Sequence, residues 1–263
     1  MNGKRSFGNV MIGILKCLAY LAVWFIIQLA VTLFAEIAII LANRGTSLDK
    51  ITELVNAKGV EITLLSNLVM ILAFSIFYRI RKSNLTNAIR LNRMPSYFMF
   101  SAVLLGISLQ IIVVLIVNIV ATAFPDLLKQ FENVNSSLNS HEMSFVMVLS
   151  VGIIAPIAEE TLFRGLILNK LNQNMNKWIA IVISSLIFGI AHGSVIGFIY
   201  TFPIGFIMGW LYIKFDSVLP SILFHMAFNI TSLVLNEISY VAIVFSVIIA
   251  VTEIVSIAKY RMK

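Results

Sequence analysis

The sequence predicts an all-α fold, a polytopic transmembrane helix bundle with about eight spans and both termini in the cytoplasm. Hydrophobic residues make up 60% of the 263-residue chain and charged residues only 12%, whereas ordinary globular domains carry about 25% charged residues. The mean hydropathy is +0.98. The apolar residues also gather into runs of about 20, the length that crosses a bilayer as a helix.

Each predicted helix is an apolar run that ends at polar, glycine or proline residues, because these residues interrupt a hydrophobic helix. The first run exceeds the length of a span, so we expect part of it to tilt or to lie outside the bilayer. It is also too long for a signal peptide and lacks a cleavage site of small residues. The predicted helices cover residues 10–42, 61–80, 97–124, 144–171, 178–193, 195–213, 219–235 and 239–258.

The basic residues predict the orientation, because cytoplasmic loops carry an excess of Lys and Arg. With the amino terminus inside, the outer segments hold only Arg44, Lys50, Lys58 and Lys129. The bias supports an even number of spans with both ends inside. The cytoplasmic segments hold Lys4, Arg5, Arg79, Arg81, Lys82, Arg90, Arg93, Lys170, Lys177, Lys214, Lys259, Arg261 and Lys263.

No repeat, low-complexity tract or soluble domain divides the chain, so residues 1–263 are predicted to form one membrane domain of a multi-pass cell-membrane protein. The net charge of +7 is spread over short loops and does not indicate a nucleic-acid partner. Cys17 is the single cysteine, which excludes an internal disulfide. The residues that could carry chemistry all lie within 144–235.

Two adjacent carboxylates, Glu159 and Glu160, lie about 15 residues into the apolar run 144–171. A charged group at the centre of a membrane helix costs at least about 2.5–3.5 kcal/mol, so such groups are usually paired and functional. Arg164 follows Glu160 by four residues, which places an acid and a guanidinium on one face of the helix. A structural ion pair is the alternative to a catalytic role.

Two further helices offer a polar face at the same spacing. His192 follows Phe188 by four residues, and Asn229 follows His225 by four residues. Polar residues in a bundle converge because lipid cannot satisfy them. At 1.5 Å per residue, Glu159 lies about 18 Å and Asn229 about 15 Å from the cytoplasmic ends of their helices, and His192 lies nearer the outer end. We expect the cavity between these helices to face the cytoplasm.

These residue types suit the hydrolysis of an amide bond. Such a reaction needs a base for water, an acid for the leaving amine and donors for the oxyanion. A Glu with a neighbouring His can activate water, and His with Asn can supply donors. There is no G-x-S-x-G nucleophile, and Phe145 stands where the H-E-x-x-H zinc motif begun by His141 and Glu142 would need its second His. Carboxylate-activated water and an unorthodox metal site both remain open.

The three motifs together resemble the CPBP family. Glu-Glu-x-x-x-Arg-Gly at 159–165, Phe-x-x-x-His at 188–192 and His-x-x-x-Asn at 225–229 occur in that order late in a polytopic chain. The family comprises the type II CAAX prenyl endopeptidases and the bacteriocin-processing and immunity proteins, also called the Abi family. The resemblance covers about residues 144–235, and the first three helices carry no motif.

The resemblance implies a role for each motif residue. Glu159 and His192 would activate the attacking water, and His225 and Asn229 would form the oxyanion hole. Glu160 and Arg164 would support them. The resemblance favours a glutamate-type, metal-independent protease, so we expect no cofactor, although Glu159, His192 and His225 could also supply a three-ligand zinc site.

The predicted function is therefore an intramembrane endopeptidase that hydrolyses a peptide bond of a membrane-associated protein or peptide. The alternative is a bacteriocin self-immunity or scaffold protein that binds a partner without proteolysis and retains the site by descent. For the single residues, His192 could instead be a core histidine, and His225 with Asn229 could only join helices. A proton-coupled transporter is disfavoured, because transporters show repeats in both halves. The expected partners are the lipid bilayer and the substrate, and the sequence leaves the oligomeric state open.

Overall fold

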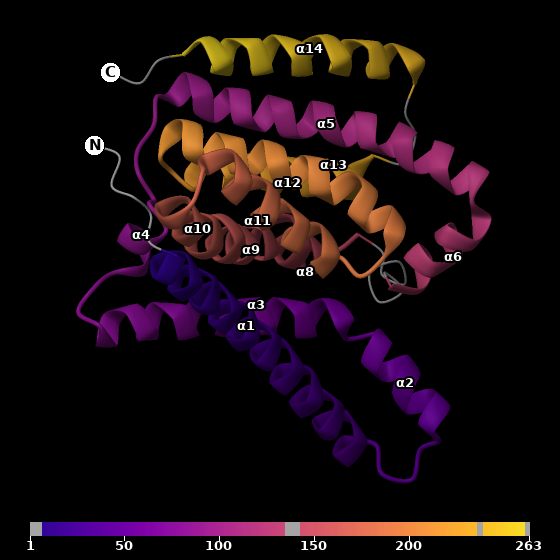
Figure 1. The fold of residues 1–263 in the computed structure, drawn as a ribbon. Coiled ribbons are helices and arrows are strands. Elements are labelled where there is room, and N and C mark those ends of the chain that lie inside the picture. The colour runs from indigo at the N-terminus through magenta and orange to yellow at the C-terminus, as the bar shows by residue number, and fades with distance from the viewer. Residues whose placement is uncertain (1–6, 135–142, 236–238, 261–263) are drawn as a thin grey trace.

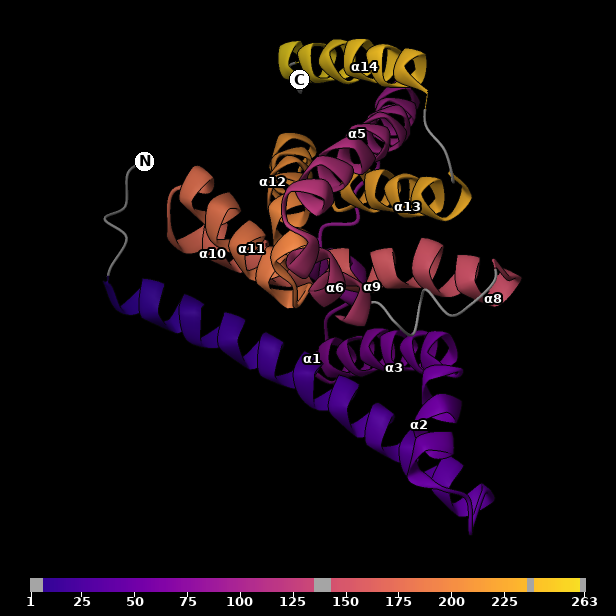
Figure 2. The ribbon, with the colours of Figure 1, turned by 90° about the vertical axis from the view of Figure 1, so that its right-hand side faces the viewer.

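The computed structural model describes residues 7–134, 143–235 and 239–260, and every regular element within these ranges is a helix. This confirms the all-α prediction. Figure 1 shows the helices stacked in layers, from α14 (Tyr240–Lys259) through α5 (Ser96–Ala123) and α13 (Leu219–Val234) to the segment α8–α10 (Phe145–Asn174) and then to α3 (Gly59–Ile80) and α1 (Phe7–Ala42). The view in Figure 2 shows the same layers from the side, with α1 running obliquely across the far edge of the bundle.

The first helix, α1 (Phe7–Ala42), has 36 residues and is about 54 Å long at 1.5 Å per residue. It exceeds the hydrocarbon core of about 30 Å, as its apolar run predicted. It packs on α3 (Gly59–Ile80) and on α10. Between them lies α2 (Leu48–Asn56), and α4 (Leu85–Ala88) follows α3. Figure 2 shows the far end of α1 and α2 projecting away from the other helices.

The helix α5 (Ser96–Ala123) begins directly after Pro95. It lies between α13 (Leu219–Val234) and α14 (Tyr240–Lys259), as Figure 1 shows. Glycine lets α5 and α13 come close: a Cβ atom on Gly106 would lie 2.3 Å from the backbone oxygen of Phe224. A side chain at that position would force the two helices apart.

The helix that carries the two glutamates is continuous from Phe145 to Asn174 but changes its winding. It consists of α8 (Phe145–Met147), the π-helical segment η1 (Val148–Ile154), α9 (Ala155–Glu160), the π-helical segment η2 (Thr161–Leu168) and α10 (Asn169–Asn174). Pro156 has no N–H to continue the α-helical pattern. Wider π turns are frequent at functional sites, and here they flank the Glu159–Glu160 pair.

The remaining helices are α11 (Lys177–Ala191) and α12 (Val195–Phe215), which pack against each other. Both begin at residues whose side chains accept a backbone N–H: Asn176 for α11 and Ser194 for α12. This N-cap satisfies donors that have no partner inside the helix. The short turn between them, predicted at residues 192–194, is confirmed.

All eight predicted helices occur, but the described residues contain six helices that are long and apolar enough to cross a membrane. The other two, α11 and α13, have 15 and 16 residues and reach only about 22–24 Å at 1.5 Å per residue. Eight full spans therefore remain a prediction. The two short helices are those that bring His192, His225 and Asn229 to the site.

Three of the described helices were not predicted. The helices α2, α4 and α6 (Pro125–Val134) fall in segments between the predicted helices. Each mixes polar and apolar residues, so an average of hydropathy along the chain does not reveal it. The fourth predicted helix also extends to residue 174 instead of 171.

The segments predicted to be cytoplasmic meet at one end of the bundle. Arg90 forms an ion pair with Asp216, and the ammonium group of Lys214 donates to the carbonyl of Ala258 at 3.0 Å. At the other end, the ring of Phe131 in α6 meets that of Tyr200 in α12, with 6.4 Å between the centroids. Segments that the charge pattern assigned to the same side of the membrane therefore lie at the same end of the bundle. The side of the membrane on which each end lies stays a prediction.

Candidate active site

The centre of the site is a buried chain of three charged or polar side chains. Oε1 of Glu160 accepts from Nη1 of Arg164 at 2.7 Å and from Nδ1 of His225 at 3.0 Å. The side chain of Glu160 is completely buried. The i, i+4 pair that the sequence predicted on one helix face is thus formed, and His225 joins it from α13.

Arg164 contacts α11 and α12 as well as Glu160. Its Nη2 donates to the carbonyl of Gly205 at 3.1 Å, and its guanidinium carbon lies 4.3 Å from the centre of the Phe188 ring. A Cβ atom on Gly205 would lie 3.1 Å from Nη2, so the glycine leaves room for the guanidinium. A buried charge needs such compensation because the membrane interior supplies none.

Glu159 points in another direction, because adjacent residues of a helix are about 100° apart around its axis. Its side chain is 28% exposed, and its Oε2 lies 3.9 Å from Nε2 of His225. His225 is therefore placed between the two glutamates, with Nδ1 toward Glu160 and Nε2 toward Glu159. Glu159 is the carboxylate that faces open space.

His192 is held by its own helix. Its Nδ1 lies 2.9 Å from the carbonyl oxygen of Phe188, and its ring meets the Phe188 ring edge to face at 4.7 Å between the centroids. A carbonyl can only accept, so Nδ1 carries the hydrogen and Nε2 keeps a lone pair in the neutral ring. This is the tautomer that a base or a water-orienting group needs.

The sequence predicted that His192 and Glu159 lie at different depths, but in the structure they lie at about the same depth. The helix of Glu159 ends at Asn174 and the helix before His192 begins at Lys177, so each residue lies about 22 Å from the turn that joins them, at 1.5 Å per residue. The predicted helix stopped three residues early and made Glu159 seem shallower.

Asn229 is anchored by one of its two amide hydrogens. Its Nδ2 donates to the carbonyl of Val151 at 2.9 Å. Val151 lies in η1, one of the π-helical segments beside the glutamates. The second hydrogen on Nδ2 remains available, because a carboxamide nitrogen carries two.

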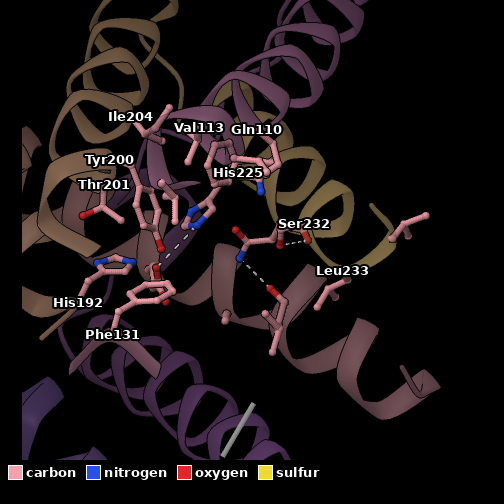
Figure 3. Close-up of a pocket in the computed structure, with 18 of the residues that line it drawn as sticks. Gln110, Val113, Phe131, His192, Tyr200, Thr201, Ile204, His225, Ser232 and Leu233 are labelled. Carbon is pink, nitrogen blue, oxygen red and sulfur yellow. Dashed lines mark hydrogen bonds and ion pairs between the residues drawn. The ribbon is translucent and has the colours of Figure 1, made fainter. Parts of the chain in front are cut away.

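Glu159, His192, His225 and Asn229 all line one cavity of about 830 Å³. Figure 3 shows His192, Tyr200 and His225 reaching into it from different helices. One wall follows a single face of the helix Phe145–Asn174 and of the residues just before it, at every fourth residue: Met143, Met147, Val151, Ala155 and Glu159. Glu159 therefore lies at the deep end and Met143 at the mouth.

The mouth lies at the end of the bundle opposite the segments predicted to be cytoplasmic. Its lining includes Asn118 near the end of α5, Phe131 of α6, Met143 before α8 and Val234 at the end of α13. The expectation of a cavity that faces the cytoplasm is therefore incompatible with the predicted orientation. The error arose because depth was counted from one helix end only, which does not show toward which end the space between helices opens.

Gln110, Tyr200 and Phe131 are among the cavity residues that were not identified from the sequence. Gln110 and Tyr200 line the wall beside His225, and Phe131 covers it from α6. Tyr200 stacks on Phe228 at 6.5 Å between the centroids. Gln110 could have been found as a polar residue in the middle of an apolar run, the signal that identified the glutamates. The other two have no such signal, because aromatic residues are common in membrane helices.

Within the described residues, no three His, Cys, Asp or Glu side chains cluster so that they could hold a metal ion. His141 and Glu142, which were considered for a zinc motif, lie outside these residues. Of the three zinc candidates, His225 uses Nδ1 on Glu160 and His192 uses Nδ1 on Phe188. Their Nε2 atoms remain, so metal dependence is a question for experiment.

Residues 141–231 match the family model described as Type II CAAX prenyl endopeptidase Rce1-like. The "Putative membrane peptidase YdiL" of Bacillus subtilis (strain 168) is 30% identical over 101 residues, which are 38% of this chain and 41% of that protein. The "UPF0177 protein YxdF" of Lactococcus lactis subsp. lactis (strain IL1403) is 33% identical over 81 residues, 30% of this chain and 44% of that protein.

The chain thus spans less than half the length of these two curated relatives. No solved structure matches it significantly. The matched segment contains every motif residue from Glu159 to Asn229. The chain is therefore a multi-pass helical membrane protein with an Rce1-like segment at residues 141–231, which confirms the resemblance to the CPBP family.

Proposed function

We propose that this protein is an intramembrane endopeptidase that hydrolyses a peptide bond of a membrane-associated protein or peptide. The observation that carries the proposal is the convergence of Glu159, His192, His225 and Asn229 on one cavity, in front of the buried Glu160–Arg164 pair. The family of the matched segment and the name of the Bacillus subtilis relative support a peptidase.

In the proposed reaction, a water molecule donates one hydrogen to the carboxylate of Glu159 and the other to Nε2 of His192. Its oxygen attacks the carbonyl carbon of the substrate, and Glu159 takes the proton. When the carbon–nitrogen bond breaks, the same proton passes to the leaving amine. In such sites the group that first acts as the base commonly acts as the acid in the later step.

The oxyanion that forms in this step needs donors. Asn229 offers its second amide hydrogen. His225 already donates Nδ1–H to Glu160, so it can donate from Nε2 only as the imidazolium, which carries a hydrogen on both nitrogens. The nitrogens of His225 lie 3.0 Å from Oε1 of Glu160 and 3.9 Å from Oε2 of Glu159. Arg164 keeps Glu160 in place for this contact.

The substrate is proposed to enter from the end of the bundle that carries α6. Between Glu159 and the mouth, the cavity is lined largely by aliphatic and aromatic side chains, among them Val113, Val117, Met147 and Phe228. This lining suits an apolar segment in an extended form. With both termini in the cytoplasm, the segment would reach the site from the outer face of the membrane.

A comparison of protein termini in cells tests the proposal. Cells that lack the gene would be complemented with the wild-type protein, with Glu159→Gln or with Glu36→Gln. The Glu36→Gln variant is the control, because it removes an acid of α1 that lies outside the cavity. We expect that a terminus produced by cleavage of one or more membrane proteins is absent both from deletion cells and from Glu159→Gln cells. The same terminus should be present in Glu36→Gln cells and in wild-type cells. The variants His192→Ala and His225→Ala should match Glu159→Gln at normal membrane abundance.

Full function of the Glu159→Gln protein would instead select the alternative, a protein that acts by binding. The change keeps the size of the side chain and replaces the carboxylate by an uncharged amide that cannot act as a base. A binding surface would tolerate it, whereas the reaction would not.

A further inference from the structure

Gln110, in the middle of α5, is a buried polar residue that the reaction above does not use. Its side chain is only 7% exposed, and its Oε1 has no hydrogen-bond partner among the described residues. A buried amide oxygen without a partner is unfavourable, and in a native protein it calls for an explanation. A binding site for a ligand is one such explanation.

The side chain of Gln110 lies in the wall of the catalytic cavity. Figure 3 shows its carboxamide directed into the space between His225 and Ser232. The close approach of α5 to α13 at Gly106, one turn earlier, brings it there. The sequence position of Gln110 is remote from the Rce1-like segment, so only the packing reveals the relationship.

Gln110 does not serve to hold the catalytic residues. His225 is held by Glu160 through Nδ1, and Asn229 is held by Val151 through Nδ2. The other residues of α5 that line the cavity are three valines and Asn118, which lies two turns closer to the mouth. Gln110 is thus the polar group that α5 contributes at the depth of the catalytic residues.

We propose that Gln110 binds the main chain of the substrate next to the bond that is cut. A carboxamide has one acceptor and two donors. Its hydrogens can donate to a backbone C=O, and a rotation of the carboxamide would bring the buried Oε1 to a backbone N–H. An extended peptide in a cavity with apolar walls needs such partners, because its polar groups leave water on entry. This inference rests on the proposed function and names an extended peptide backbone as the feature recognised.

The test compares Gln110→Leu with Gln28→Leu, the same change on α1 at a residue that does not line the cavity. The probe is a quenched fluorogenic peptide that spans a cleavage site found in the comparison of termini. For Gln110→Leu we expect KM to rise about tenfold, as for the loss of one to two hydrogen bonds, with kcat within about twofold of wild type. Gln28→Leu should leave both unchanged.

Thermal unfolding in detergent provides a second readout that needs no substrate. Leucine removes the unpartnered oxygen, so we expect Gln110→Leu to unfold at the same temperature as wild type or higher. A clear fall in that temperature would overturn the proposal, because it would show a structural role. An unchanged KM with a reduced kcat would also overturn it in favour of oxyanion stabilisation.

The two proposals fail in different ways. If wild type and Glu159→Gln give identical protein termini, the proposed protease is wrong, and Gln110 cannot be a residue that binds its substrate. If Glu159→Gln alone abolishes cleavage and Gln110→Leu matches wild type in KM, only the inference on Gln110 is wrong.

Discussion

His225 and Glu160 are 65 positions apart in the chain, yet Nδ1 of the one lies 3.0 Å from Oε1 of the other. The contact joins α13 to the helix of the two glutamates and orients the imidazole, so that Nε2 faces Glu159. Neither helix could place this histidine alone. The first prediction concerns Arg164, because the carboxylate of Glu160 accepts from both His225 and Arg164.

Replacement of Arg164 by Met should reduce both abundance and activity. The substitution leaves the buried carboxylate of Glu160 without its counter-ion, and breaking a buried pair in this way costs about 3–5 kcal/mol. Membrane abundance by immunoblot and cleavage of the fluorogenic peptide provide the measurements. The double variant Arg164→Met/Glu160→Gln should recover abundance but not activity, because the support for His225 is still lost. Normal activity of either variant would contradict the role of the pair.

Replacement of Asn229 by Ala should lower kcat by about 10²–10³-fold, the effect of removing one oxyanion donor, with little change in KM. Ser232→Ala is the matched control, because Ser232 lines the same cavity but donates to the backbone oxygen of Asn229. A rise in KM at constant kcat would instead make Asn229 a residue that binds the ground state.

Reporter fusions should place residue 87 in the cytoplasm and residue 135 on the outer side. Five of the basic residues predicted to be cytoplasmic lie between 79 and 93, and cytoplasmic loops carry such an excess. A paired set of alkaline phosphatase and fluorescent protein fusions reports both sides. The opposite result would reverse the orientation of the whole chain.

The mouth of the cavity should be accessible from outside the cell. In a Cys17→Ser background, Met143→Cys should react with a membrane-impermeant maleimide in intact cells, because Met143 is exposed and lines the mouth. Ser83→Cys, at the other end of the bundle, should react only after lysis. If only position 83 is labelled in intact cells, the mouth of the cavity faces the cytoplasm. The substrate would then enter from the cytoplasm.

Purified enzyme should keep most of its activity after treatment with a strong chelator, once elemental analysis shows it to be free of metal. The reaction proposed here draws its base from Glu159 and its oxyanion donors from His225 and Asn229, and an Asn is a poor zinc ligand. Activity that disappears on stripping and returns with one equivalent of zinc would assign the same residues to a metal site.

Much of the fold could be predicted from the sequence, because apolar runs are a local signal. The eight apolar helices and the turn at residues 192–194 were predicted and occur. The helices α2 and α6 were missed because amphipathic helices have no strong average hydropathy, and α4 was missed because it has only four residues. Whether α11 and α13 cross the membrane stays a prediction, because these helices have only 15 and 16 residues.

The sequence by itself determined that this chain is a helical membrane protein and that Glu160 pairs with Arg164, because hydropathy and the helical period act over a few residues. Only the tertiary structure decided that His225 lies between the two glutamates, that Gln110 joins the cavity and that the cavity opens away from the predicted cytoplasmic end. These relationships depend on how each helix is rotated and how closely helices approach. Contacts such as that of Gly106 with Phe224 set both, and they join positions too remote in the sequence for any periodicity to connect.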